Sequence, residues 1–311
     1  MEILKVDHLT KDYGSGRGVF DVSFSINEGE VFGFLGPNGA GKSTTIRHLM
    51  GFSKPQKGKC EIFGQESFSH YDKILKQVGY IPGEIALPDG LTGKEFLKMM
   101  SDMRGNEDPE KEKEMLELFQ LDDASLRQNC KRMSLGVKRK LAVVAAFAGD
   151  PKVLILDEPT SGLDPVMQKV FVNYIKEEKK RGKTILLSSH IFSEVDATCD
   201  RIAIIKDGRI VSLFNADDLR HKTTKNYHLH FLTQEAYEGF LAKAEQNPDF
   251  KIIEKHPENL WLGLLVDDKN INEMIALASA YPLKRITNIK ETLQDYFMKF
   301  YREDKNFGGA L

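Results

Sequence analysis

The sequence of 311 residues contains the segment Gly36-Pro37-Asn38-Gly39-Ala40-Gly41-Lys42-Ser43-Thr44, which fits the pattern G-x-x-x-x-G-K-[ST]. It follows an apolar run that we predict to form a strand over residues 30–35. In such a loop the glycines let consecutive backbone N–H groups turn toward phosphate oxygens, and the next helix presents its positive N-terminus. The nine residues therefore predict a nucleotide-phosphate loop in which Lys42 reaches the β- and γ-phosphates and Ser43 ligates Mg²⁺.

Two acidic residues, Asp157 and Glu158, follow a second apolar run at 153–156. An unbroken apolar run is typical of a strand covered on both faces of a parallel sheet. An Asp at the tip of such a strand helps to position Mg²⁺ in phosphate-loop enzymes. Glu158 comes next and points to the other side of the strand, where it can polarise an attacking water. The pair predicts nucleotide hydrolysis, with Lys42 and Glu158 as catalytic residues.

Short β-rich runs alternate with helical periodicity along most of the chain, which predicts an α/β fold with a sheet and crossover helices. Charged helical segments between the two apolar strands predict a helical insertion at about residues 93–148. We expect further strands at 184–188 and 202–206, a hairpin turn at 207–209, and helices at 93–105 and 109–121.

The character of the sequence changes after about residue 218, where a polar stretch, RHKTTKN, begins. We therefore predict one domain over 1–218 and a small α+β accessory domain over 219–311. The tail pattern predicts the order β-α-β-β-α-β, a split βαβ arrangement. Its expected strands are 227–232, 251–255, 260–266 and 285–289, and its expected helices are 234–246, 270–280 and 291–302.

Composition excludes several classes of protein. Apolar residues make up 41% and charged residues 29% of the chain, as in ordinary globular proteins. The longest apolar run, at 141–148, is far shorter than the roughly 20 residues of a membrane-spanning helix. The net charge of −2 argues against a nucleic-acid partner. Glu2 and Asp7 stand where a secretory signal needs a basic patch, so we expect a cytoplasmic protein.

Four further parts of the sequence resemble motifs of the ABC ATPases. Met133-Ser134-Leu135-Gly136-Val137-Lys138, just before a helix that we expect to begin near Arg139, resembles their signature sequence. Ser161-Gly162-Leu163-Asp164 is similar to their D-loop, His190 to their switch histidine, and Tyr13 to the aromatic residue that stacks on adenine. The resemblance spans about residues 1–218 and implies a phosphate-loop ATPase domain with a helical subdomain.

That resemblance also implies cofactors and partners. It implies ATP and Mg²⁺, with His190 catalytic and Tyr13 and Asp164 at the nucleotide. Two such domains would close head to tail as a homodimer, with Ser134 and Gly136 of one chain facing the γ-phosphate held by Lys42 of the other. Separate transmembrane permease subunits would hold the protein peripherally on the inner face of the cell membrane. Ser134 also suits a second role, as the N-cap of the following helix.

One position departs from the family pattern. A glutamine usually follows the strand that resembles residues 78–81, whereas this chain reads Pro82-Gly83-Glu84, with Gly83 at the expected place. Glu84 offers oxygen atoms and is a candidate Mg²⁺ ligand in place of the glutamine. The alternative is a solvated loop acid.

Two alternatives concern the wider function. The segment 289–297 resembles the C-terminal extension of drug and antimicrobial-peptide exporters, which favours export over import. The rival is a soluble ABC ATPase that acts on the ribosome or on DNA. Such proteins carry two ATPase domains or a long coiled coil, and this sequence has neither. The transported substrate is not encoded in these motifs, because the membrane subunits choose it.

Overall fold

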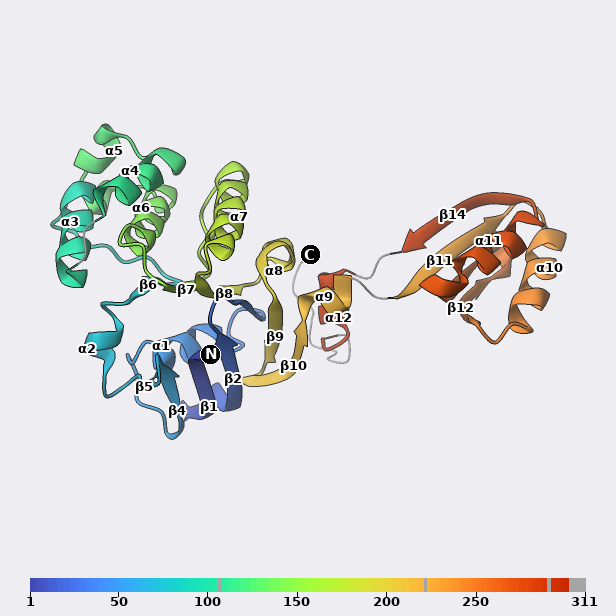
Figure 1. Ribbon diagram of the computed structural model, residues 1–311, viewed down its shortest axis with the longest axis horizontal. Helices are drawn as coiled ribbons and strands as arrows, with labels where there is room; N and C mark the ends of the chain where they lie inside the picture. Colours follow the sequence, from blue (N-terminus) through green and yellow to red (C-terminus); the bar gives the residue numbers. More distant parts are fainter. Residues whose placement is uncertain (106–107, 221–222, 290–291, 302–311) are drawn as a thin grey trace. The chain divides into compact units, whose positions relative to one another are not determined.

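The computed structural model describes residues 1–105, 108–220, 223–289 and 292–301. The chain divides into two compact units, Met1–Ala216 and the residues from Asp217 onward, and each has its own core (Figure 1). Among the described residues, no helix combines the length and the apolar character that crossing a bilayer requires.

The first unit is organised around a six-stranded sheet with the order β10-β9-β3-β8-β7-β6. All neighbouring pairs are parallel except β10 with β9, so the α/β class predicted from the sequence is confirmed. Every residue of β3, β7 and β8 is buried, which explains their unbroken apolar runs. The strands are β3 (Val31–Leu35), β6 (Val78–Ile81), β7 (Val153–Asp157), β8 (Thr184–Ser189), β9 (Arg201–Lys206) and β10 (Arg209–Asn215).

The register of this sheet aligns the carboxyl ends of three central strands. Leu35 pairs with Ser189, and Asp157 pairs with Ser188. Ligands of open α/β sheets bind beyond the carboxyl ends of the strands. The residues that follow β3, β7 and β8 therefore emerge at one edge, where the predicted site lies.

A second, antiparallel sheet covers part of the first unit, with the order β2-β1-β4-β5. Its apolar side chains share a core with the central sheet and the first helix, and Phe24 stacks on Phe32 with 5.0 Å between ring centroids. The elements are β1 (Glu2–Asp12), β2 (Gly18–Asn27), β4 (Lys57–Ile62), β5 (Gln65–Glu66), α1 (Lys42–Leu49) and α2 (Tyr71–Ile74).

Four α-helices occupy the chain between β6 and β7 and form a cluster of their own (Figure 1). The last of them begins at Leu135, so the start predicted near Arg139 is wrong by about one turn. The reason is that the Ser134 hydroxyl caps the helix by accepting a hydrogen bond from Val137 N at 3.3 Å. The helices are α3 (Gly93–Arg104), α4 (Pro109–Leu118), α5 (Asp123–Arg127) and α6 (Leu135–Phe147), with a 3₁₀ turn, η1 (Cys130–Arg132).

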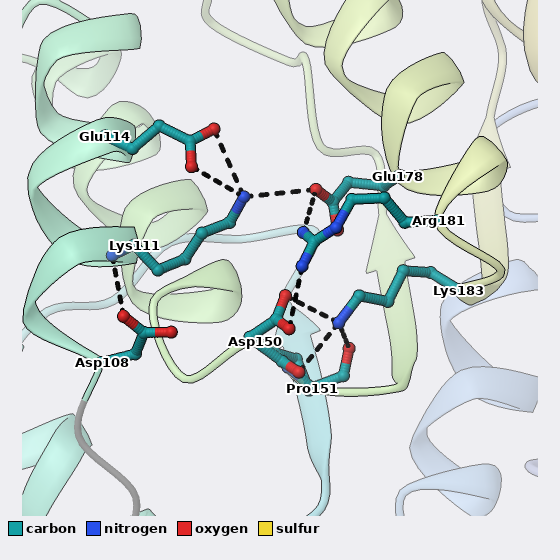
Figure 2. A network of polar contacts seen from close by, with 8 residues as sticks. All are labelled: Asp108, Lys111, Glu114, Asp150, Pro151, Glu178, Arg181 and Lys183. Atoms are coloured by element: carbon teal, nitrogen blue, oxygen red, sulfur yellow. Dashed lines mark hydrogen bonds and ion pairs between the residues drawn. The ribbon is translucent and has the colours of Figure 1, made fainter.

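Two more helices, α7 (Pro165–Lys180) and α8 (Phe192–Thr198), follow β7 and β8. A network of charged side chains joins α7 to α4 (Figure 2). Glu178, 2% exposed, lies 3.3 Å from Lys111 Nζ on α4 and 2.7 Å from Arg181 Nη1. Asp150 extends the network to Lys183. Burial alone would raise the pKa of Asp150, but hydrogen bonds and charge from Lys183 and Arg181 lower it below its ordinary value.

The second unit has the order β-α-β-β-α-β predicted from the sequence. Its sheet is antiparallel throughout, with the order β12-β13-β11-β14. The helix predicted over 291–302 is observed as α12 (Leu293–Met298), and residues 291 and 302 lie outside the described residues. The other elements are β11 (Thr224–Phe231), α10 (Gln234–Glu245), β12 (Phe250–His256), β13 (Trp261–Asp267), α11 (Ile271–Ser279) and β14 (Leu283–Ile289), preceded by the short α9 (Ala216–Arg220).

We expect Glu178→Gln to lower the free energy of unfolding by about 3 kcal/mol, because it removes the one buried carboxylate that contacts both Lys111 and Arg181 and leaves Lys111 only the exposed Glu114. Urea denaturation followed by circular dichroism measures the effect. The matched control is Glu177→Gln, whose exposed pair with Lys180 should contribute less than about 1 kcal/mol. Equal stability of the two variants would contradict a structural role for the buried network.

Candidate functional site

A cavity of about 460 Å³ lies at the edge where the central strands end. Its wall combines four segments that are far apart in the sequence: the loop and helix after β3, and the residues that follow β6, β7 and β8. The lining residues include Asn38, Ser43, Thr44, Pro82, Gly83, Glu84, Asp157, Glu158, Ser161 and His190. The topology thus brings the phosphate loop, both acids and the histidine predicted from the sequence into one place.

The loop that precedes α1 depends on its glycines. Gly41 has φ 113°, a left-handed backbone, and a Cβ there would lie 2.8 Å from a methyl carbon of Val19. A Cβ on Gly36 would lie 2.6 Å from the carbonyl oxygen of Ile205. No residue larger than glycine fits at either position. The two glycines therefore let the loop backbone pass close to β9 and continue directly into α1.

Lys42 is the first residue of α1 and is 5% exposed. Its ammonium donates to the carbonyl oxygens of Gly36 at 2.6 Å and Pro37 at 3.2 Å, and lies 3.0 Å from Glu158 Oε1. A buried charge needs such partners, because burial removes its hydration. The loop therefore wraps around the ammonium, with the carboxylate as its only full counter-charge among the contacts that the structure shows.

Glu158 contacts two predicted site residues at once. Its second oxygen lies 2.6 Å from His190 Nδ1, at the end of β8. The residue has φ 48°, a backbone conformation that a non-glycine residue rarely adopts and that is common at functional sites. Its backbone N–H donates to Ser188 O at 3.0 Å, which fixes the turn. Glu158 therefore links Lys42 and His190.

Asp157 has other neighbours in the cavity than Glu158 has. Its Oδ1 accepts a hydrogen bond from Ser188 Oγ at 2.5 Å. A Cβ built on Gly83 would lie 3.0 Å from Asp157 Oδ2 and 3.7 Å from Ser43 Oγ, so two oxygen atoms converge on the space that a side chain at position 83 would enter. Burial, followed by the Asp157 charge, raises the pKa of the neighbouring Tyr80 to about 12, which keeps that phenol neutral at physiological pH.

The sequence departs from the family pattern at Gly83 and Glu84, and both residues line the cavity. Gly83 brings only backbone to the converging oxygens, and the adjacent Glu84 lines the same cavity with an exposed side chain. The structure therefore leaves both interpretations of Glu84, ligand or solvated acid, compatible with its position.

Outside the phosphate loop, four predicted residues are absent from the described cavity lining. Ser134 caps α6, and Asp164 caps α7 by accepting hydrogen bonds from Val166 N and Met167 N at 3.0 Å. A Cβ on Gly136 would lie 3.2 Å from Gly162 O, so the signature-like segment and the D-loop-like turn lie side by side. Tyr13 is 58% exposed at the end of β1. All four belong to surfaces outside the phosphate cavity.

Sequence reasoning missed one residue of this region, Arg139 on α6. It is 2% exposed and donates hydrogen bonds to backbone carbonyls of two loops that line the cavity. It stands between Lys138 and Lys140, and nothing in this basic run of three residues indicates that the middle one is the buried one. The residue type was the one signal in the sequence that pointed to Arg139. The planar guanidinium has five donors, so arginine suits several fixed acceptors better than lysine does.

Comparison with known proteins identifies the family. A family model described as "ABC transporter" matches residues 19–161. The bacitracin transport ATP-binding protein BcrA of Bacillus licheniformis is 33% identical over 300 residues, which cover 96% of each chain. The chain belongs to the ABC transporter family. An uncharacterized ABC transporter ATP-binding protein of Bacillus subtilis, YhcH, is 40% identical over 70% of this chain and 71% of its own.

Solved structures agree with this assignment. One described as an ATP-binding subunit of an ABC transporter is 33% identical, with a TM-score of 0.64, and covers 70% of this chain and 92% of its own. A dimeric ATP-binding cassette with ADP and Pi is 23% identical, with a TM-score of 0.62, and supports the fold alone. The chain is therefore an ATP-binding subunit of the ABC transporter type, in a family that binds and hydrolyses ATP.

Proposed function

We propose that this chain is the ATP-hydrolysing subunit of an ABC exporter, with its catalytic centre at the Lys42–Glu158 contact. The observation that carries the proposal is the convergence on one ammonium of the phosphate loop and of the acid that follows β7. An ammonium held by backbone carbonyls and one carboxylate is prepared to exchange that carboxylate for phosphate oxygens. Phosphates would gain charge-assisted hydrogen bonds, and Glu158 would be released toward the nucleotide.

The oxygen atoms of Ser43 and Asp157 form a donor set that suits Mg²⁺. Ser43 Oγ and Asp157 Oδ2 converge over Gly83, and hydroxyl and carboxylate oxygens are the ligands that Mg²⁺ prefers. We assign these two atoms, with Glu84 as a third candidate, to hold the ion. When bound, Mg²⁺ neutralises charge on the β- and γ-phosphate oxygens.

Glu158 is then the general base for the attacking water. Its carboxylate is oriented by the turn at the end of β7 and by His190 Nδ1 at 2.6 Å. A proton taken from water would reside on this carboxylate, and the imidazole would hold the carboxyl group in place. His190 thus positions Glu158. We expect the contact between these two residues to remain after phosphate has displaced Glu158 from Lys42.

The residues outside the cavity suit a second copy of the chain. Ser134 is exposed at the start of α6, so its surface is free to face a nucleotide held by another subunit. Gly136 lies in the first turn of α6, beside the turn that ends at Asp164, and the exposed ring of Tyr13 offers a flat apolar face for adenine. We propose an ATP-dependent homodimer in which each cavity is completed by the partner's signature segment.

Relatives support export rather than import. BcrA and the linearmycin resistance ATP-binding protein LnrL of Bacillus subtilis match this chain over 96% and 92% of its length, so the likeness extends into the second unit. One is named for bacitracin transport and the other for resistance to linearmycin. We propose permease subunits that dock beside the loop at 83–84 and the helices of residues 93–121, and that hold this chain peripherally at the cytoplasmic face of the cell membrane.

We expect Glu158→Gln to slow ATP turnover by about 10² to 10⁴, the usual contribution of a general base. Nucleotide should bind as well as before or better, because the change removes a negative charge beside the triphosphate. The closed dimer should therefore accumulate with ATP and Mg²⁺, as measured by light scattering.

Two controls make this experiment decisive. Adding Ser134→Arg should abolish the dimer, because it places a bulky charge where the partner's γ-phosphate must lie. Lys42→Ala should lose nucleotide affinity, because it removes the ammonium that the phosphates require. Full turnover by Glu158→Gln would exclude this residue as the base.

The membrane assignment is tested by purifying the tagged chain from its source membranes in mild detergent. We expect a polytopic membrane protein to accompany it in a fixed ratio. Recovery with ribosomes instead would overturn the transporter proposal in favour of the soluble alternative.

A further inference from the structure

Arg139 combines near-complete burial with a permanent charge. All three of its nitrogen atoms donate to backbone carbonyls: Nε to Ser161 at 2.9 Å, Nη1 to Pro82 at 2.9 Å and Nη2 to Gly83 at 2.7 Å. Burial lowers the pKa of Arg139, whereas the charges of Asp157 and Glu158 raise it, and a guanidinium remains protonated in any case. A well-packed apolar side chain would avoid the cost of burying this charge. Its presence therefore calls for a role other than filling space.

The three acceptors belong to the wall of the phosphate cavity. Pro82 and Gly83 precede α3, and Ser161 lies in the turn after β7. The two loops follow different strands, β6 and β7. The rigid guanidinium fork of Arg139 on α6 connects them. The fork is planar, so it fixes the direction of each hydrogen bond as well as its length.

Gly83 explains why this connection matters. Gly83 has no side chain that could contact Asp157, although its backbone lies so close that a Cβ there would be 3.0 Å from Asp157 Oδ2. Arg139 holds this loop in place by donating hydrogen bonds to the carbonyl oxygens of Pro82 and Gly83. The other end of the fork holds Ser161, whose N–H donates to Glu158 O at 3.1 Å. Both acids of the cavity therefore border backbone that Arg139 fixes.

We propose that Arg139 is a positioning residue for ATP hydrolysis, which holds the loop at Pro82–Gly83 and the turn at Ser161 in register with Asp157 and Glu158. The proposal rests on the function proposed above. Arg139 is not among the lining residues of the cavity, and its described hydrogen bonds reach Ser161, Pro82 and Gly83 and not Lys42, so we expect it to act on the geometry of the acids and not on phosphate binding by the loop. Its loss should therefore lower kcat and leave nucleotide affinity nearly unchanged.

The test measures kcat and the Kd for ATP in Arg139→Met, which keeps length and burial but removes charge and donors. We expect kcat to fall on the order of 10²-fold, the usual effect of a misplacement of about 1 Å, with Kd changed less than about threefold. The matched control is Lys140→Met on the same helix, a half-buried neighbour outside the cavity lining, which should keep wild-type kcat.

Arg139→Lys covers the case in which the methionine variant does not fold. It keeps the charge but loses the fork, so we expect a fall in kcat of about tenfold, again with Kd preserved. Wild-type kcat in either folded variant would overturn the proposal, as would a loss of affinity as large as the loss of kcat. Absence of hydrolysis by the wild-type protein is a separate result, which would contradict the proposed function itself and this proposal with it.

Discussion

The contact between Lys42 and Glu158 is the constraint around which the site is built. The ammonium sits in a loop too tight for any side chain at Gly36 or Gly41, and it needs an anion because it is almost fully buried. The nearest anion is an acid that lies 116 residues further along the chain. The parallel sheet makes that meeting possible, because it ends β3 and β7 at the same edge. In the function proposed above, nucleotide binding exchanges the Glu158 carboxylate on Lys42 for phosphate oxygens.

The proposed exchange gives the loops around the cavity a role. If phosphate replaces Glu158 on Lys42, the direction of the carboxylate depends on its own turn, on His190 and on the backbone around Ser161. Arg139 holds that backbone together with the loop at Gly83. The buried pair between Lys111 and Glu178 stabilises the same unit, because it joins α4 to α7, the helix that follows Asp157 and Glu158. In the function and the inference proposed above, nucleotide binding and hydrolysis rely on different sets of contacts.

Much of this arrangement is predictable from the sequence, because it depends on local rules. Unbroken apolar runs predicted the buried strands, and the phosphate-loop pattern together with strand-end acids predicted the contents of the cavity. The helix α6 begins about one turn before the predicted start, because the Ser134 hydroxyl, which the sequence also offered as an N-cap, caps it at Leu135. Arg139 was missed because its partners are backbone carbonyls at 82, 83 and 161, which only the folded chain brings together. No spacing in the sequence records such acceptors.

A crystal structure of the wild-type protein with Mg²⁺ and a non-hydrolysable ATP analogue tests the exchange most directly. The decisive quantity is the distance from Lys42 Nζ to Glu158 Oε1, which is 3.0 Å in the present structure. We predict that it exceeds about 4 Å, the limit of an ion pair, while Lys42 Nζ lies about 3 Å from β- and γ-phosphate oxygens. An analogue bound with Lys42 still paired to Glu158 and with its phosphates elsewhere would contradict the account.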